Sequence, residues 1–155
     1  MATLNKKLSN FDFGKVPSAK DMKMGIVVAD WNEQITDRLF QGAIEALNSC
    51  GCTQIIHKNV PGSFELVYGA NSAQRMDFDA IIAIGCIIQG ETRHFEFISN
   101  AVAQGIKDLN LNGKAPVVFC VLTDETIEQS KARSGGDKGN KGAEAAVTAL
   151  RMTSL

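Results

Sequence analysis

The chain has 155 residues, of which 45% are apolar and 21% are charged, and its formal net charge is −1. This length suits one domain with a real core, and the near-neutral charge gives no basis for binding nucleic acid or an anionic membrane. No apolar block typical of a secretory signal peptide occurs in residues 1–20, and no apolar run approaches the roughly 20 residues that span a bilayer. We therefore expect a single domain over residues 1–155 of a cytoplasmic protein without a membrane segment.

Strands and helices alternate along the chain after a polar segment, residues 1–21, that predicts an extended N-terminal arm. Apolar, β-branched runs predict four strands, over residues 23–29, 53–60, 80–88 and 116–122. Apolar residues at three- and four-residue steps predict four helices. Two of these helices are marked by apolar stripes, from Ile35 to Leu47 and from Phe95 to Leu109. The other two are expected over residues 64–76 and 143–152.

Alternation of strand and helix implies a parallel sheet covered on both faces. We therefore predict an α/β fold, a flavodoxin-like three-layer sandwich with a four-stranded parallel sheet flanked by helices. Gly51 is a suitable stop for the first helix. Residues 123–133 predict a short helix or a loop, and residues 134–142, rich in Gly, Lys and Asn, predict a solvated loop.

The four cysteines, Cys50, Cys52, Cys86 and Cys120, match no metal-binding or redox motif. Cys50 and Cys52 are separated by one residue, which is neither zinc nor thioredoxin spacing, and no second pair completes a metal site. Cys86 and Cys120 lie in apolar runs, where cysteine typically packs as a small hydrophobic residue. The pattern predicts reduced thiols and no bound metal.

Residues 80–97 join a buried strand to a helix, and we predict an active-site corner at this junction. In parallel sheets, ligands bind at the carboxyl ends of strands, beside the N-termini of the following helices. Free backbone N–H groups and the helix dipole favour an anion there. His94, one of only two histidines, stands at the junction, and its imidazole can carry out proton transfer near neutral pH. The other, His57, lies within a strand and is expected to be a surface or packed residue.

The turns after the other strands should reach the same edge of the sheet. Trp31, the only tryptophan, either stacks on a planar ring or covers a hydrophobic edge. Asn32 either reads a ring edge or caps the next helix. Glu65 either contacts a ligand or complements the helix dipole, and Arg133 either pairs with a phosphate or is a solvated charge. Because Phe119 lies inside an apolar strand, its side chain is expected to pack in the core.

Several nucleotide-binding patterns are absent from the sequence. There is no GxGxxG after the first strand and no GxxxxGK[ST], which argues against dinucleotide and P-loop sites. Asp30 has no neighbouring carboxylate, which argues against a phosphoacceptor receiver domain. The residues alone therefore predict a small-molecule site for a planar group and an anion, with one histidine for proton transfer.

Five motifs resemble the lumazine synthase family, in the right order and spacing. They are P-G-S-F-E at 61–65, G-C-I-I-Q-G-E-T-x-H-F at 85–95, P-V-V-F-C-V-L-T at 116–123, I-E-Q at 127–129 and G-N-K-G at 139–142. The resemblance runs from about residue 23 to residue 152. It implies condensation of 5-amino-6-ribitylaminouracil with 3,4-dihydroxy-2-butanone 4-phosphate to 6,7-dimethyl-8-ribityllumazine in riboflavin biosynthesis. Phosphate and water leave, and no metal or redox cofactor is needed.

The resemblance also implies roles for individual residues, with His94 at the proton-transfer position. The positions that match the pyrimidine and ribityl site are Trp31, Asn32, Ser63, Phe64, Glu65, Cys86, Ile87 and Ile88. The positions that match the phosphate site are Glu91, Thr92, Arg133 and Lys141. Phe119 matches a residue that serves the active site of a neighbouring subunit, which replaces the core-packing interpretation.

The family resemblance implies a homopentamer, and some members assemble twelve pentamers into an icosahedral cage. Residues 135–142 lack an insertion, as in the cage-forming members. Gln89 and Asp137 stand where relatives often carry a basic residue, which removes positive charge near the expected phosphate site.

Two other functions agree with the same residues. An archaeal-type riboflavin synthase, of related fold, would use the lumazine itself and would not require the butanone phosphate. A non-catalytic flavin- or lumazine-binding carrier would keep the stack at Trp31 and tolerate the loss of His94.

Overall fold

A four-stranded parallel sheet forms the centre of the computed structural model, which describes residues 11–155. Its strands are β1 (Lys23–Ala29), β2 (Gln54–Val60), β3 (Ala80–Ile88) and β4 (Val117–Asp124). They lie in the order β2-β1-β3-β4, and every neighbouring pair is parallel. The predicted parallel sheet is therefore confirmed. The part of the predicted arm in residues 1–10 lies outside the described residues.

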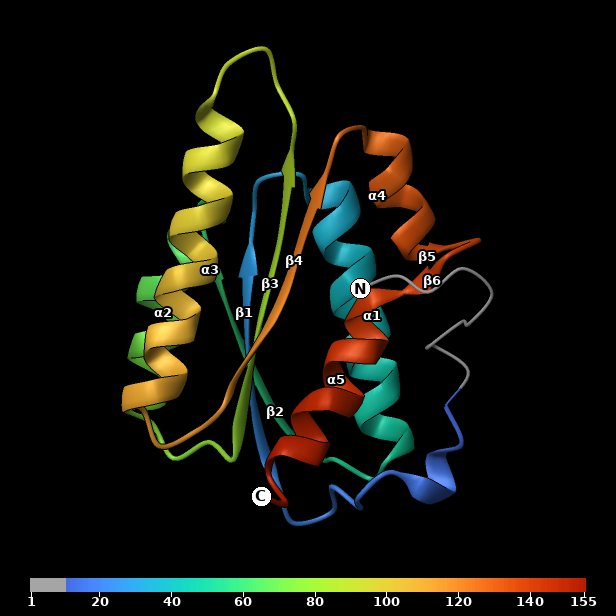
Figure 1. The fold of residues 1–155 in the computed structure, drawn as a ribbon. Helices are drawn as coiled ribbons and strands as arrows, with labels where there is room; N and C mark the ends of the chain where they lie inside the picture. The colour runs from blue at the N-terminus through green and yellow to red at the C-terminus, as the bar shows by residue number, and fades with distance from the viewer. Residues whose placement is uncertain (1–10) are drawn as a thin grey trace.

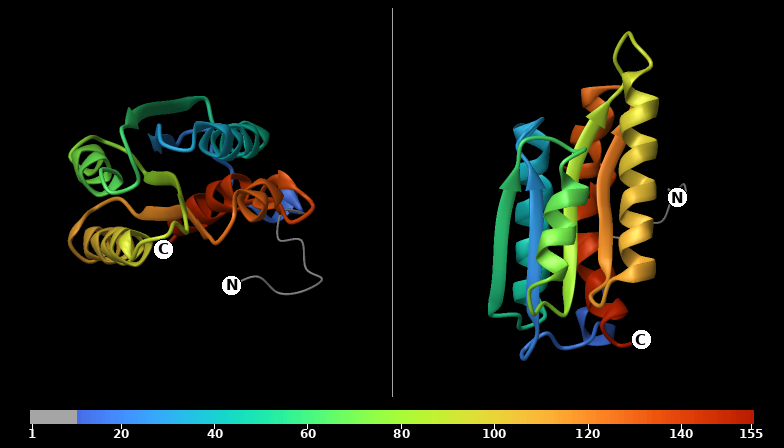
Figure 2. Two further views of the ribbon diagram at one scale, coloured as in Figure 1. Left: turned by 90° about the horizontal axis from the view of Figure 1, so that it is seen from above. Right: turned by 90° about the vertical axis from the view of Figure 1, so that its left-hand side faces the viewer.

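Helices cover both faces of the sheet (Figures 1 and 2). On one face lie α1 (Glu33–Ser49) and α5 (Lys141–Met152), with the short α4 (Ile127–Arg133) above α5. On the other face lie α2 (Leu66–Gln74) and α3 (His94–Asn112). This arrangement confirms the predicted three-layer sandwich.

The two hydrophobic cores explain why the strands read as continuous apolar runs. Ile82 and Ile84 of β3 pack in the cluster beneath α1 and α5, whereas Ile81 and Ala83 pack in the cluster beneath α2 and α3. Successive side chains of a strand point to opposite faces, so a strand covered on both faces needs apolar residues at every position.

The boundaries of β1 and β3 match the prediction, but the predicted helix over residues 64–76 is shorter. It spans Leu66–Gln74, so Ser63 and Glu65 stand in the turn before α2 and not in its first turn. The Leu66 amide donates to the Ser63 carbonyl at 3.3 Å, a tight three-residue step, and the Gly69 amide donates to the Glu65 carbonyl at 2.9 Å. Helical bonding therefore begins only after the tight turn.

The prediction of a solvated loop over residues 134–142 is only partly confirmed, because residues 135–138 are exposed but the segment contains regular structure. Ser134–Gly136 (β5) and Gly139–Asn140 (β6) form an antiparallel hairpin, and Ser134 is buried. Gly135 and Gly139 have φ values of 110° and 81°, which favour glycine and permit the tight reversal. The glycines of this segment therefore serve the backbone angles of the hairpin, whose central residues 135–138 are exposed.

Asn140 anchors the start of α5. Its Oδ1 accepts hydrogen bonds from the amides of Gly142 and Ala143 at 2.8 and 3.4 Å, and its Nδ2 donates to the Arg38 carbonyl of α1 at 2.9 Å. This helix cap satisfies amides that have no partner within the helix. Helix α5 therefore begins at Lys141, two residues before the predicted start.

The residues that precede β1 pack against the end of α1. Phe13–Lys15 form a short 3-10 helix, and the Ala19 amide donates to the Cys50 carbonyl at 2.8 Å. Ala19 is fully buried, and Gly51, with φ at 86°, ends α1 as predicted. No helix in residues 11–155 combines the length and the apolar character needed to cross a membrane.

Cys86 and Cys120 are buried, as predicted for cysteines in apolar strands, and neither is in a disulfide. Burial raises the pKa of the Cys120 thiol to about 12; the Glu144 carboxylate acts in the same direction, and Lys141 opposes it. The ordinary pKa of a thiol is 9.0. Between these two values the folded protein keeps a proton that the unfolded chain releases.

We expect the free energy of unfolding to fall as pH rises from about 9 toward about 12. The loss attributable to Cys120 has a slope of up to about 1.4 kcal/mol per pH unit, because folding must reprotonate the thiol. Urea unfolding across this range should show a shallower slope for Cys120→Ala than for Cys50→Ala, since Cys50 is only half-buried. Equal slopes in the two variants would contradict this assignment.

Candidate active site

A cavity of about 520 Å³ opens at the carboxyl edge of the sheet. Its lining comes from the turn after β1, the turn after β2, the end of β3 and the start of α3. The chain leaves β1 for β2 on one side and returns to β3 on the other, so the strand order changes direction between β1 and β3. Ligands of open α/β sheets bind at such switch points.

The cavity brings together most of the residues predicted for one site. The predicted residues in its lining are Trp31, Asn32, Ser63, Phe64, Glu65, Cys86, Ile87, Ile88, Thr92 and His94. Gly62, Gly90, Phe95 and Ile98 also line it. Phe95 and Ile98 belong to the apolar stripe of α3, and their spacing in the sequence does not distinguish a pocket wall from the core.

Asn32 joins the turn after β1 to the end of β3. Its Nδ2 donates to the Cys86 carbonyl at 2.9 Å, and its side chain makes no capping bond to α1. Asn32 therefore occupies the N-cap position of α1, but its side chain does not cap the helix. Its φ of 63° is the only positive value at a non-glycine position in residues 11–155, and asparagine tolerates this left-handed conformation better than most residues.

The two contributions of Asn32 can be separated by substitution. Asn32→Gly removes the hydrogen bond but accepts the backbone angle, so we expect a loss of about 1 kcal/mol in the free energy of unfolding. Asn32→Ala adds the cost of the left-handed conformation, for a total of about 2 kcal/mol. Urea denaturation measures both values. Equal losses would show that backbone strain contributes nothing.

Two aromatic side chains stand exposed at this cavity. Trp31 is 72% exposed and Phe64 is 54% exposed. Trp31 therefore does not cover a hydrophobic edge of its own chain. An exposed indole beside a cavity offers a flat apolar face for a planar ring.

Ser63 has a hydroxyl without a partner among the described residues, although the residue is buried. A Cβ atom at Gly85 would lie 2.7 Å from the Ser63 Oγ, so the absence of a side chain at Gly85 leaves room for this hydroxyl. A buried hydroxyl that makes no hydrogen bond is costly. Because Ser63 lines the cavity, a ligand with polar groups can supply the missing bond.

His94 is exposed and is the first residue of α3. Its backbone amide donates to the Thr92 Oγ1 at 3.4 Å, which shapes the turn between β3 and α3. Glu91 lies in the same turn and is exposed, but it does not line the cavity. The imidazole thus stands at the wall of the cavity, where it can exchange protons with a bound molecule and with water.

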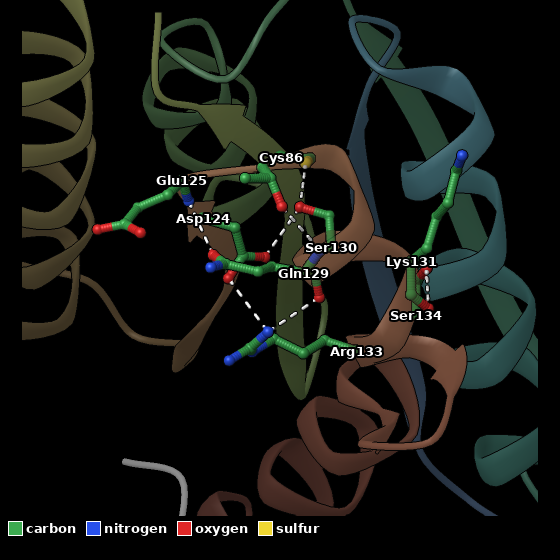
Figure 3. A network of polar contacts seen from close by, with 9 residues as sticks. Cys86, Asp124, Glu125, Gln129, Ser130, Lys131, Arg133 and Ser134 are labelled. Atoms are coloured by element: carbon green, nitrogen blue, oxygen red, sulfur yellow. Dashed lines mark hydrogen bonds and ion pairs between the residues drawn. The ribbon is translucent and has the colours of Figure 1, made fainter.

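Besides Glu91, three further predicted site residues lie outside the lining of this chain's cavity. Arg133 is held at the carboxyl end of β4, where its Nη1 lies 2.9 Å from the Gln129 carbonyl and 3.6 Å from the Asp124 Oδ1 (Figure 3). Arg133 is therefore not a solvated charge. Lys141 forms an ion pair with Glu144 at 2.6 Å. Phe119 is 40% exposed, so the prediction that it packs in the core is wrong.

A family model described as 6,7-dimethyl-8-ribityllumazine synthase matches residues 21–155. Proteins of that name from Flavobacterium johnsoniae and Christiangramia forsetii are 56% and 54% identical to this chain. The alignments cover 98% and 100% of this chain, and 82% and 95% of the relatives. A protein of the same name from Porphyromonas gingivalis is 50% identical, over 100% of this chain and 98% of its own length.

The family match includes every strand and helix that borders the cavity, and the relatives from Christiangramia forsetii and Porphyromonas gingivalis align over nearly their whole length. It therefore covers the residues on which the resemblance in the motifs rested. The chain belongs to the 6,7-dimethyl-8-ribityllumazine synthase family.

Proposed function

We propose that this chain condenses 5-amino-6-ribitylaminouracil with 3,4-dihydroxy-2-butanone 4-phosphate to form 6,7-dimethyl-8-ribityllumazine. The observation that carries the proposal is the cavity at the switch point between β1 and β3, lined by the residues that match the family's pyrimidine site. Family membership supports the reaction, because the relatives bear the name of this product.

In this proposal the pyrimidine lies against Trp31, whose exposed indole provides a stacking surface. Ser63 and Glu65 bind the ribityl chain, because their side chains can form hydrogen bonds with its hydroxyl groups. Phe64 and Asn32 complete this wall. The backbone of Cys86, Ile87 and Ile88 reads the pyrimidine edge at the end of β3.

The chemistry is a sequence of condensations and proton transfers. The amine of the pyrimidine attacks the ketone, and loss of water forms an imine. A proton leaves carbon, phosphate departs, and the ribitylamino nitrogen closes the ring with loss of a second water. His94 accepts and returns protons during these steps, since an imidazole can serve in both directions near neutral pH. Reactants and products balance without an external oxidant or reductant, so the reaction requires no redox cofactor.

The backbone amides of Glu91 and Thr92, in the turn before α3, receive the phosphate of the butanone, with Arg133 and Lys141 as its cationic partners. Because Arg133, Lys141 and Phe119 do not line the cavity of their own chain, we propose that they complete the cavity of an adjacent copy. Strand β4 lies at an edge of the sheet, and the half-exposed Phe119 on it is suited to such a contact. The assembly is a homopentamer, as the family resemblance implies.

Mixing the two substrates with the purified protein tests the reaction directly. We expect lumazine absorbance and free phosphate to appear together, in equal amounts. Riboflavin formed from the lumazine alone would instead identify a riboflavin synthase, and binding without turnover would identify a carrier.

Two inactive variants test whether the site is shared between copies. We expect His94→Ala and Arg133→Ala to be strongly impaired alone, but to regain activity when they are unfolded and refolded together. In a ring with shared sites, about a quarter of the sites would combine an intact His94 with an intact Arg133 from the neighbour. If both residues served the cavity of their own chain, no site could recover. An active monomer in dilute sedimentation velocity would refute the pentamer.

A further inference from the structure

A continuous row of side chains leads from the end of β3 to Arg133 (Figure 3). The Cys86 thiol donates to the Ser130 Oγ at 3.4 Å, and the Ser130 hydroxyl donates to the Asp124 Oδ2 at 2.8 Å. The other oxygen of Asp124, Oδ1, lies 3.6 Å from the Arg133 Nη1. Thiol, hydroxyl and carboxylate therefore follow one another with matched donors and acceptors.

The row is buried at its centre. Ser130 is completely buried and Asp124 is 7% exposed. A buried carboxylate is costly unless both oxygens have partners, and here Ser130 holds one oxygen while Arg133 faces the other. Ser130 and Arg133 are three residues apart in α4, a spacing that places both side chains on the same face of a helix.

Helix α4 is itself firmly attached to the end of β4. The Thr126 Oγ1 caps the helix by accepting from the Gln129 amide at 3.3 Å, and the Gln129 Oε1 accepts from the Glu125 amide at 3.0 Å. The Gln129 carbonyl in turn accepts from Arg133. Two fixed oxygens, one from Gln129 and one from Asp124, thus hold a single nitrogen of the guanidinium.

We propose that Asp124, held in place by Ser130, is the positioning residue for Arg133. This inference rests on the proposed function, in which Arg133 binds the phosphate of the butanone substrate. Only Nη1 of Arg133 is engaged within residues 11–155, and the other terminal nitrogen points away from Asp124 (Figure 3). A guanidinium fixed along one edge presents its remaining donors to a phosphate in one orientation, which reduces the ordering cost of binding.

Asp124 has two effects of opposite sign on a bound phosphate. Its negative charge repels the anion, whereas its hold on Arg133 improves the geometry of the donors. The proposal states that the second effect is larger. If charge alone mattered, removing the carboxylate would tighten phosphate binding, so the direction of the change distinguishes the two effects.

The test compares Asp124→Ala with Asp124→Asn, whose single amide oxygen can still accept from Arg133 while its NH2 group donates to the Ser130 hydroxyl oxygen. We expect Asp124→Ala to raise the KM for the butanone phosphate, and the Kd for inorganic phosphate, by about tenfold. The KM for the pyrimidine should stay within about twofold, and Asp124→Asn should restore most of the loss. Unchanged or tighter phosphate binding in both variants would overturn the proposal.

A double-mutant cycle shows whether Asp124 acts through Arg133. In an Arg133→Ala background, Asp124→Ala should weaken phosphate binding no further; an additional tenfold loss would overturn the proposal. If Arg133→Ala alone leaves phosphate binding unchanged, the proposed role of Arg133 fails, and its positioning by Asp124 fails with it. If Arg133→Ala weakens binding but Asp124→Ala does not, only the positioning inference fails.

Should Asp124→Ala lose its folded circular dichroism spectrum, Ser130→Ala carries the test. This variant leaves the carboxylate in place but removes the hydroxyl that holds it. We expect inorganic phosphate to bind about threefold more weakly, with the pyrimidine unaffected. Phosphate binding equal to that of the wild type would overturn the proposal.

Discussion

His94→Ala is expected to lower kcat by about 100-fold or more, while the Kd for the pyrimidine stays within about twofold. The imidazole stands at the wall of the cavity, at the start of α3, where it can exchange protons with the bound substrates. Without it, water must carry out each transfer. Steady-state kinetics with both substrates and a separate titration with the pyrimidine distinguish turnover from binding.

The chain contains a matched control, because its only other histidine is His57. His57 lies on β2 and is exposed, with its ring 4.9 Å from that of Phe40 and outside the lining of the cavity. We expect His57→Ala to retain full turnover. Unchanged turnover in His94→Ala would remove His94 from the mechanism and favour the carrier interpretation, whereas equal losses in both variants would indicate a general defect.

Gly142→Ala is expected to lower the free energy of unfolding by about 3 kcal/mol or more. Gly142, in the first turn of α5, lies so close to α1 that a Cβ atom there would overlap the Leu39 carbonyl oxygen. The obstacle is backbone, so the two helices must separate to relieve it. Alanine is intrinsically better than glycine in a helix by about 1 kcal/mol, so any loss arises from packing.

Gly90→Ala is the control for this experiment. A Cβ atom at Gly90 would meet nothing within 4 Å, so we expect its free energy of unfolding to change by less than about 0.5 kcal/mol. Urea denaturation of both variants gives the comparison. A Gly142→Ala protein as stable as the wild type would show that α1 and α5 can separate at little cost.

Local sequence pattern was sufficient to predict the main elements of the fold. Residues 80–88 are apolar at every position because both sides of β3 face a core. The stripe of α3 was recognised because Val102 and Ile106, four residues apart, are both buried against the sheet. Such periodicities show which faces of a strand or helix are buried. They do not show which strands are neighbours, so the order of the strands in the sheet was not predicted.

The G-N-K-G motif shows where pattern alone was insufficient. The resemblance of this motif to the family implied that Lys141 is a site residue. The other three residues of the motif have structural roles. Gly139 turns the β5–β6 hairpin, Asn140 caps α5 and bonds to Arg38, and Gly142 allows the close approach to α1. Arg38 and Leu39, which Asn140 and Gly142 meet, are about 100 residues away in the sequence. No local periodicity encodes contacts over that separation.

For the site, the parallel direction of the strands was enough to predict that Trp31, Glu65 and His94 meet at one edge, and all three line the cavity. Three-dimensional packing decided the rest. It paired Asn32 with Cys86 and Asp124 with Ser130, and it kept Arg133 out of the cavity of its own chain. Buried positions recur at a fixed spacing along a strand or helix, so they can be predicted from the sequence of that element alone. A hydrogen bond between distant segments depends on how those segments finally pack, which no single segment specifies.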